Sequence, residues 1–368
     1  MEFALSLATP ADDADIRRLL AANPVAGNLS LTYEREPNYF WGCGVMGQFD
    51  QIIIARQPSS GALAGVLSRS VRPMFVNGQV EPVGYLSQLR VDRRFQGLWL
   101  VPQGMRYLRQ LHADGRAPGY IATIIEGGRQ ATGILVNRPR RQYLNFQPVC
   151  HLWTLALILR RRKSIPDSPW RLERGSAATL PEIIDFLQRH GPAKQFFPAY
   201  TAADFTGSPQ TRDFRVEDFV LARRNGKLAG VMGLWDQSGF KQTVVQSYSG
   251  AMGRLRPLTN LGLRLIGGAP LPEPGQPLRY AFAAFTCVAD NDPAVFDLLL
   301  RQTYNLAGER GFAHLMVGLT EPDPLLAVAR RWLHVPYKSR LYTVSWPDEP
   351  GWHQRPDDRT PYLELAAM

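Results

Sequence analysis

An order of predicted elements that occurs twice along the chain constrains the fold of this sequence more than any other feature. Each half begins with apolar residues at helical spacing, in residues 9–20 and 177–187. Two apolar runs joined by a turn follow, at 52–56 and 62–67 in the first half and at 219–223 and 228–232 in the second. Each half then predicts strand, helix, strand, helix and strand, at 83–91, 101–114, 119–125, 128–137 and 146–159, and again at 279–289, 293–310, 313–319, 323–333 and 338–346. The chain is therefore expected to hold two copies of one α+β unit.

Turn signals indicate how the strands are connected. Asn225-Gly226 and Asn77-Gly78 each lie between apolar runs, which is a strong signal for an antiparallel hairpin. The segment 160–170 is basic and carries two prolines, so it is expected to link the halves. These boundaries predict an N-terminal domain over 1–159, the linker 160–170, a C-terminal domain over 171–348 and a tail over 349–368.

The stretch from Tyr85 to Arg109 is the strongest functional signal. It predicts a strand that ends at Val91, a short basic loop containing Gly97, and a helix that starts near Leu100 or Val101, with Pro102 in its first turn. A glycine loop at a helix N-terminus beside arginines suits a phosphate group. The alternative is a strand-to-helix turn whose glycine serves packing alone.

The equivalent turn in the second half has the opposite character. Residues 288–293 contain no glycine and carry Asp290 and Asp292 before Pro293, a sequence that is typical of a capped helix start. Negative charge at this position would repel a phosphate. The C-terminal copy is expected to be degenerate as a cofactor site.

Composition narrows the class of protein. The net charge is +10, but only five of the basic residues are lysines, a bias that suits a GC-rich genome as well as a function, so nucleic-acid binding is not expected. The longest apolar run, 150–159, is about half of what a bilayer span requires, so it predicts a buried strand and no membrane partner. Three distant cysteines and the lack of a secretory signal favour a cytoplasmic protein without disulfides.

The order of helix, antiparallel meander, strand, phosphate loop, helix, strand and helix resembles the GNAT acetyltransferase superfamily. Its motif places Arg/Gln-x-x-Gly-x-Gly/Ala after a strand ending in Val, and here Arg94 and Gly97 match after Val91, whereas Trp99 replaces the second small residue. The resemblance covers most of 1–158 and, more faintly, 170–346. It implies two tandem GNAT-like domains, each a mixed, mostly antiparallel sheet flanked by helices.

The resemblance also implies a site for acetyl-CoA, as co-substrate, between the strands at 83–91 and 119–125. The pantetheine would pair with the backbone of the first strand and the pyrophosphate with the amides of the loop. The cofactor-binding residues expected on this basis are Leu89, Arg90, Val91, Arg94, Phe95, Gln96, Gly97, Leu98 and Trp99.

Family chemistry suggests a glutamate, or a water held by one, as base and a tyrosine as acid. Glu126 ends the 119–125 strand and is the first candidate for the base, with Glu81 as a weaker one; Glu126 could instead stabilise a helix start. Tyr143 is the candidate acid, with a buried aromatic at a strand edge as the alternative. A backbone N–H near 89–91 could hold the oxyanion.

The acidic and aromatic segment 31–41 falls where this family covers the acceptor. Glu34 and Glu36 could attract a cationic amine, and Tyr39 or Trp41 could stack on it; a surface helix with buried aromatics is the alternative. The six histidines show no ligand spacing, so no metal is expected.

The function predicted from the sequence is transfer of an acetyl group from acetyl-CoA to a primary amine of a small molecule or peptide, by direct attack. A homodimer is one assembly that the sequence allows. Two alternatives stay open: a non-catalytic acyl-CoA-binding or regulatory protein, and a tandem GNAT relative that transfers aminoacyl groups.

Overall fold

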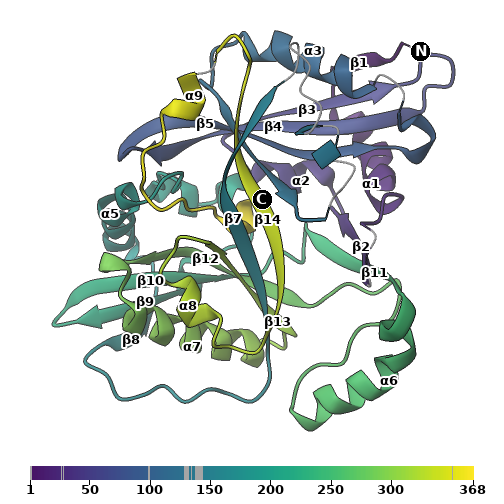
Figure 1. The fold of residues 1–368 in the computed structure, drawn as a ribbon. Helices are drawn as coiled ribbons and strands as arrows, with labels where there is room; N and C mark the ends of the chain where they lie inside the picture. Colours follow the sequence, from purple (N-terminus) through teal and green to yellow (C-terminus); the bar gives the residue numbers. More distant parts are fainter. Residues whose placement is uncertain are drawn as a thin grey trace.

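One large sheet connects both halves of the chain (Figure 1). The computed structural model describes residues 2–25, 27, 29–97, 100–127, 132–133, 135–136, 144–349 and 351–368. Within these residues the sheet has twelve strands, and two further strands form a small sheet of their own. This is the α+β class expected from the sequence. No helix of the described chain is long and apolar enough to cross a bilayer.

The predicted elements that fall on described residues appear in the predicted order. The first half contains β1 (Ala4–Leu7), α1 (Asp13–Ala21), β2 (Leu29–Glu34), α2 (Tyr39–Gly44), β3 (Phe49–Arg56), β4 (Leu63–Val76), β5 (Gln79–Val91), α3 (Leu100–His112), β6 (Tyr120–Ile125) and β7 (Asn145–Ile158). The second half contains β8 (Arg171–Arg174), α5 (Leu180–His190), β9 (Phe219–Arg224), β10 (Lys227–Trp235), β11 (Gln242–Tyr248), α6 (Gly250–Leu265), β12 (Tyr280–Val288), α7 (Pro293–Glu309), β13 (His314–Thr320), α8 (Leu326–Ala329), β14 (His334–Ser345) and α9 (Gly351–Gln354). Each half also contains elements that the sequence did not predict, namely β1, β2, β8, β11, α6 and α9. The helix expected at 128–137 falls largely outside the described residues.

The final strand of each half lies against the sheet of the other half. The strand order is β1-β3-β4-β5-β6-β14-β7-β13-β12-β10-β9-β8. Thus β14 pairs with β6, β7 pairs with β13, and the two strands pair with each other through the middle of the molecule (Figure 1). A second connection comes from β2, which pairs antiparallel with β11.

Local sequence explains the predicted boundaries. Asn77-Gly78 and Asn225-Gly226 form the expected hairpin turns, and all four residues have positive φ, as two-residue hairpins require. Helix α3 starts at Leu100, so Pro102 lies in its first turn, where a missing N–H costs no helical hydrogen bond.

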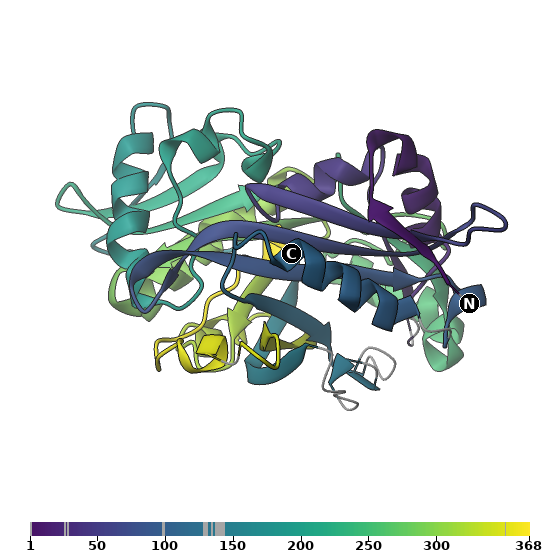
Figure 2. The same ribbon diagram turned by 90° about the horizontal axis from the view of Figure 1, so that it is seen from above.

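Helices cover both faces of the sheet in the first half. Side chains of α3, including Met105 and Leu108, pack on Ile53 and Leu67, whereas α1 packs on the opposite face, and Figure 2 shows the two helices on either side of the strands. The core on the α1 side also includes side chains of the second half, among them Phe285. The two halves therefore share one continuous core on that face.

Candidate functional site

The two parallel strands of the first half, β5 and β6, diverge after a short paired stretch. The register of β5 with β6 runs over three residue pairs, from Gly84–Tyr120 to Leu86–Ala122. A β-bulge follows in β5, where Gln88 has a φ of 56° and the register with β4 shifts. A bulge leaves one residue unpaired and bends the strand. We name the space between the two diverging strands the first splay.

The first splay contains a buried polar atom without a partner among the described residues. Residues 87–91 of β5 are only partly buried. The side-chain oxygen Oε1 of Gln88 is buried and accepts no hydrogen bond from the described residues. Tyr85 on β5 reaches across to β6, where its hydroxyl lies 3.2 Å from Oγ1 of Thr123, and burial raises its pKa. An elongated ligand that pairs with β5 would meet the unsatisfied oxygen of Gln88 here.

Hydrogen bonds between its own residues stabilise the loop after β5. The carboxylate of Asp92 accepts hydrogen bonds from the backbone N–H of Arg94 at 2.9 Å and from its guanidinium at 2.8 and 3.0 Å. This guanidinium holds the pKa of Asp92 below its usual value. Phe95 is buried against Phe3, with ring centroids 5.7 Å apart. Arg93 is exposed and forms no ion pair with the described residues, so it is the uncommitted cation of this loop.

Gly97 leaves the mouth of the loop open. Its φ is 79°, and a Cβ built there would meet no atom of the described residues within 4 Å. The conformation suits glycine, and the free space allows a ligand to approach the backbone closely.

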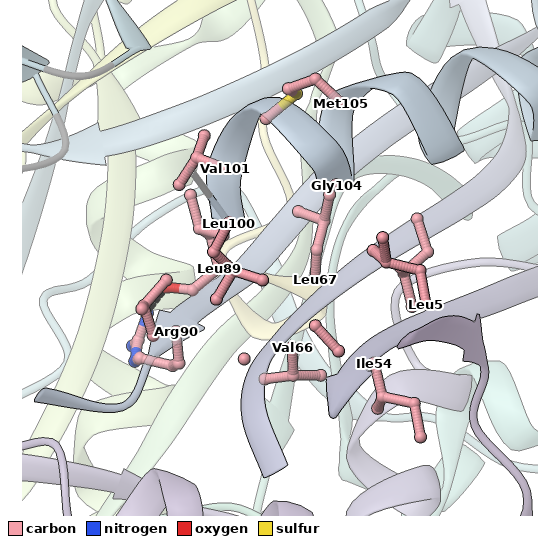
Figure 3. A pocket seen from close by; sticks show the side chains of 14 residues that line it. Leu5, Ile54, Val66, Leu67, Leu89, Arg90, Leu100, Val101, Gly104 and Met105 are labelled. Carbon is pink, nitrogen blue, oxygen red and sulfur yellow. Dashed lines mark hydrogen bonds between the residues drawn. The ribbon is translucent and has the colours of Figure 1, made fainter. Parts of the chain in front are cut away.

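The loop is anchored by the packing of α3 on the sheet. Leu100, Val101 and Met105 of α3 lie over Leu89 of β5 and Leu67 of β4 (Figure 3). The cavity between them is small, about 30 Å³. Apolar side chains line this face of the loop.

The equivalent strands of the second half diverge in the same way. The register of β12 with β13 also runs over three pairs, from Tyr280–His314 to Phe282–Met316. A bulge follows at Phe285, whose φ is 55°. We name the space beyond it the second splay.

The C-terminal tail fills the second splay. Oε2 of Glu364 accepts hydrogen bonds from the backbone N–H of Phe285 at 2.7 Å and from the Tyr362 hydroxyl at 2.8 Å. Leu365 packs on Gly318 of β13 so closely that a Cβ on that glycine would lie 2.7 Å from Cβ of Leu365. Burial raises the pKa of Glu364. In contrast to the first splay, the β12 residues from Ala281 to Val288 are all buried.

The loop after β12 is a helix cap, as the sequence predicts. Oδ1 of Asp292 accepts hydrogen bonds from the backbone N–H groups of Ala294 and Val295 at 2.8 and 3.3 Å. The carboxylate thus occupies the position at the N-terminus of α7 that an anion would need.

Glu126 directly follows β6 and belongs to a charged group. Its Oε1 lies 3.1 Å from Nε2 of His151, and that nitrogen is also 2.6 Å from Nη2 of Arg340. The other ring nitrogen lies 2.8 Å from the carboxylate of Glu321. The candidate base is half-exposed and directed toward β7 and β14. Tyr143, Leu98 and Trp99 lie outside the described residues.

Only residues 39–41 of the segment 31–41 are helical, as the start of α2, so the alternative of a surface helix holds for that part alone. The first residues of the segment belong to β2, and Glu34 accepts a hydrogen bond from Thr32 at 2.6 Å. Glu36 forms an ion pair with Arg17, and the hydroxyl of the fully buried Tyr39 lies 3.0 Å from Oγ of Ser68. In the described structure, these side chains already have protein partners.

Sequence reasoning missed Gln88 and the place of the tail. It named both arginines of the loop as counter-charges, but it could not show that Arg94 pairs with Asp92. No residue pattern marks a bulge at Gln88. For the tail, the apolar run after Glu364 was a signal of burial, but only the fold shows where that run lies.

Comparisons with known proteins bear on the fold. No protein-family model matches the sequence, and no curated protein is similar to it in sequence. Among solved structures, an N-myristoyltransferase of Saccharomyces cerevisiae with bound myristoyl-CoA superposes with a TM-score of 0.60 and 10% identity, over 93% of this chain and 82% of that one. A GCN5-related N-acetyltransferase of Sphaerobacter thermophilus gives 0.56 and 12%, over 100% and 98%.

A third structure is similar over only part of its length. It is the GCN5-related glucosamine N-acetyltransferase region of a fungal multi-domain GH3 β-N-acetylglucosaminidase, with a TM-score of 0.64 and 13% identity, over 94% of this chain and 38% of that one. The chain therefore has the GNAT fold that the sequence resemblance predicts, in an arrangement that superposes on N-acetyltransferases and on N-myristoyltransferase alike.

Proposed function

We propose that this chain is an acyl-CoA-dependent N-acyltransferase with one cofactor site, in the first splay. The observation that carries the proposal is the contrast between the two splays. The first leaves residues 87–91 partly exposed and is followed by an open glycine loop, whereas the second is filled by the tail and followed by a helix cap. The fold shared with proteins of this activity supports the same conclusion.

The proposal gives each part of the site a chemical role. The pantetheine would lie along 89–91. The pyrophosphate would lie at the loop 94–97, where the backbone of Gly97 is open to close approach and Arg93 supplies a counter-charge. A backbone N–H at the bulge would polarise the thioester carbonyl. In the second half, the N–H of Phe285 already donates to a carboxylate at 2.7 Å, which supports the capacity of such a bulge to hold an oxyanion.

The reaction forms one bond and breaks another. A neutral amine attacks the thioester carbonyl, the C–N bond forms, the C–S bond breaks, and the proton lost by the amine balances the one gained by the thiolate. We keep Glu126 as the proposed base, acting through a water, and Tyr143 as the proposed acid.

We further propose acetyl as the acyl group, a small-molecule or peptide amine as acceptor and the cytoplasm as location. Because the similar structures include an N-myristoyltransferase, the length of the acyl chain is the first property to measure. Calorimetry with acetyl-, octanoyl- and myristoyl-CoA, followed by thiol release with a panel of amines, tests these points. We expect binding of acetyl-CoA at one site per chain and thiol release that depends on an amine.

Three other results would change the conclusion. Binding of no acyl-CoA contradicts the proposal. Tight binding without transfer to any amine favours a regulatory acyl-CoA-binding protein. Binding of charged tRNA with a steep dependence on salt favours the aminoacyl-transferring alternative.

A further inference from the structure

Helix α6 presents leucines to solvent in a way that soluble domains avoid. Leu255, Leu258, Leu261 and Leu265 are 50%, 66%, 55% and 73% exposed. They follow one another at intervals of three or four residues, so they lie on one face of the helix. An apolar stripe of this kind on the outside of a protein marks a surface that binds a partner.

The opposite face of α6 attaches the helix to the protein through polar contacts. Oδ1 of Asn260 accepts a hydrogen bond from the backbone N–H of Leu271 at 2.8 Å, and the Arg256 guanidinium lies 5.4 Å from the ring centroid of Tyr248. Figure 1 shows α6 projecting from the edge of the molecule, away from the large sheet. The leucine face is thus directed away from the protein.

Positive charge surrounds the leucines. Arg254 and Arg264 are exposed and form no ion pair with any described residue. The sequence holds no Asp or Glu between residues 237 and 272. The basic linker adds Arg161, whose Cγ lies 3.5 Å from the position of a Cβ on Gly267, just after α6. Aliphatic side chains within a cationic surface complement an anionic lipid headgroup layer above acyl chains.

We infer that α6 and the adjoining linker form a docking surface for an anionic membrane, with the leucines inserted between the acyl chains and the arginines at the headgroups. We choose a lipid as the partner because the exposed stripe is purely aliphatic. A nucleic acid is also anionic, but it would offer no apolar contact for four leucines. This inference departs from the expectation of no membrane partner, and it is independent of the proposed function.

Sedimentation of the full chain with vesicles tests the inference. One set contains phosphatidylcholine alone, and the other includes about one third phosphatidylserine. We expect binding to the anionic vesicles and at least a tenfold weaker partition for a double variant, Leu258→Glu with Leu261→Glu. We also expect Arg254→Gln with Arg264→Gln to weaken binding at low salt and to matter less at about 1 M salt.

Val80→Glu is the matched control, because Val80 is 56% exposed on the distant β4–β5 hairpin. It should bind vesicles as the wild type does. The inference is overturned if the wild type binds neither vesicle set, or if the double variant and the control bind equally. It is also overturned if the double variant converts a dimer to a monomer in light scattering while vesicle binding is absent, since the face would then bind a second copy of the chain.

Discussion

Gly97 is the residue whose substitution tests the phosphate loop most selectively. Replacement by Asp adds a side chain and a negative charge at a backbone φ of 79°, where a Cβ would meet no atom of the described residues within 4 Å. We expect Gly97→Asp to abolish measurable acyl-CoA binding in calorimetry.

Gly226→Asp is the control for backbone strain. Gly226 has the same φ of 79° and equally open surroundings, but it lies in the β9–β10 turn of the other half. Both variants should lose about 1 kcal/mol of stability. Equal loss of acyl-CoA binding in both variants would show that Gly97 acts through folding alone.

Asp50 predicts a dependence of stability on pH. Burial raises the pKa of this carboxyl to about 6 from an ordinary value of 3.8. The folded state therefore holds the proton more tightly than the unfolded state does, so the contribution to the free energy of unfolding falls as pH rises from about 4 to 6 and stays lost above it. The loss is at most about 3 kcal/mol.

Asp50→Asn removes this titration. Denaturant unfolding at pH 8 should show the variant to be more stable than the wild type, whereas at about pH 3.5 the two should agree. A variant that is less stable at pH 8 would mean that the ionised carboxylate stabilises the fold, in opposition to the burial argument.

At the scale of elements, local patterns predicted the order of helices and strands, because periodicity and turn residues act over a few positions. Asn77-Gly78, Asn225-Gly226 and Pro102 each fixed a boundary correctly. For the segment 31–41, a surface helix was the alternative prediction, and only 39–41 are helical. Residues 31–34 belong to β2, which pairs with β11 more than 200 residues away, a contact that no local pattern could indicate.

Substitution of Asp292, at the start of α7, tests whether this residue caps the helix or takes part in cofactor binding. Asp292→Ala removes the acceptor for two N–H groups and should lower stability by about 1 kcal/mol. Because the second splay is filled by the tail, acyl-CoA affinity measured by calorimetry should stay unchanged. Weaker acyl-CoA binding by this variant would indicate that the cofactor binds in the second half of the chain, contrary to our proposal.

At the scale of the whole molecule, the sequence could not predict that β7 and β14 lie against the sheet of the other half. Such pairing depends on contacts between residues far apart in the chain, and either partner offers the same kind of apolar edge. For the same reason only part of the candidate site could be predicted. The loop at 92–97 depends on neighbouring residues, whereas the second splay is closed by a contact between Phe285 and Glu364, which are 79 residues apart in the sequence.

Because β7 and β14 each pair with the sheet of the other half, we expect the two halves to unfold together. The tandem-repeat interpretation and the boundary at 159–171 stay predictions, but a shared core and two crossed strands leave neither half a complete sheet of its own. Scanning calorimetry should show one transition whose calorimetric and van't Hoff enthalpies agree. Two resolved transitions would show that the halves are independent domains.

The most direct test of the central claim is a structure of this chain with an unreactive acyl-CoA analogue. Our account predicts one analogue in the first splay, with its pantetheine along 89–91, its pyrophosphate at 94–97 and its carbonyl oxygen at the bulge near Gln88. An analogue between β12 and β13, with the tail displaced from Phe285, would contradict it.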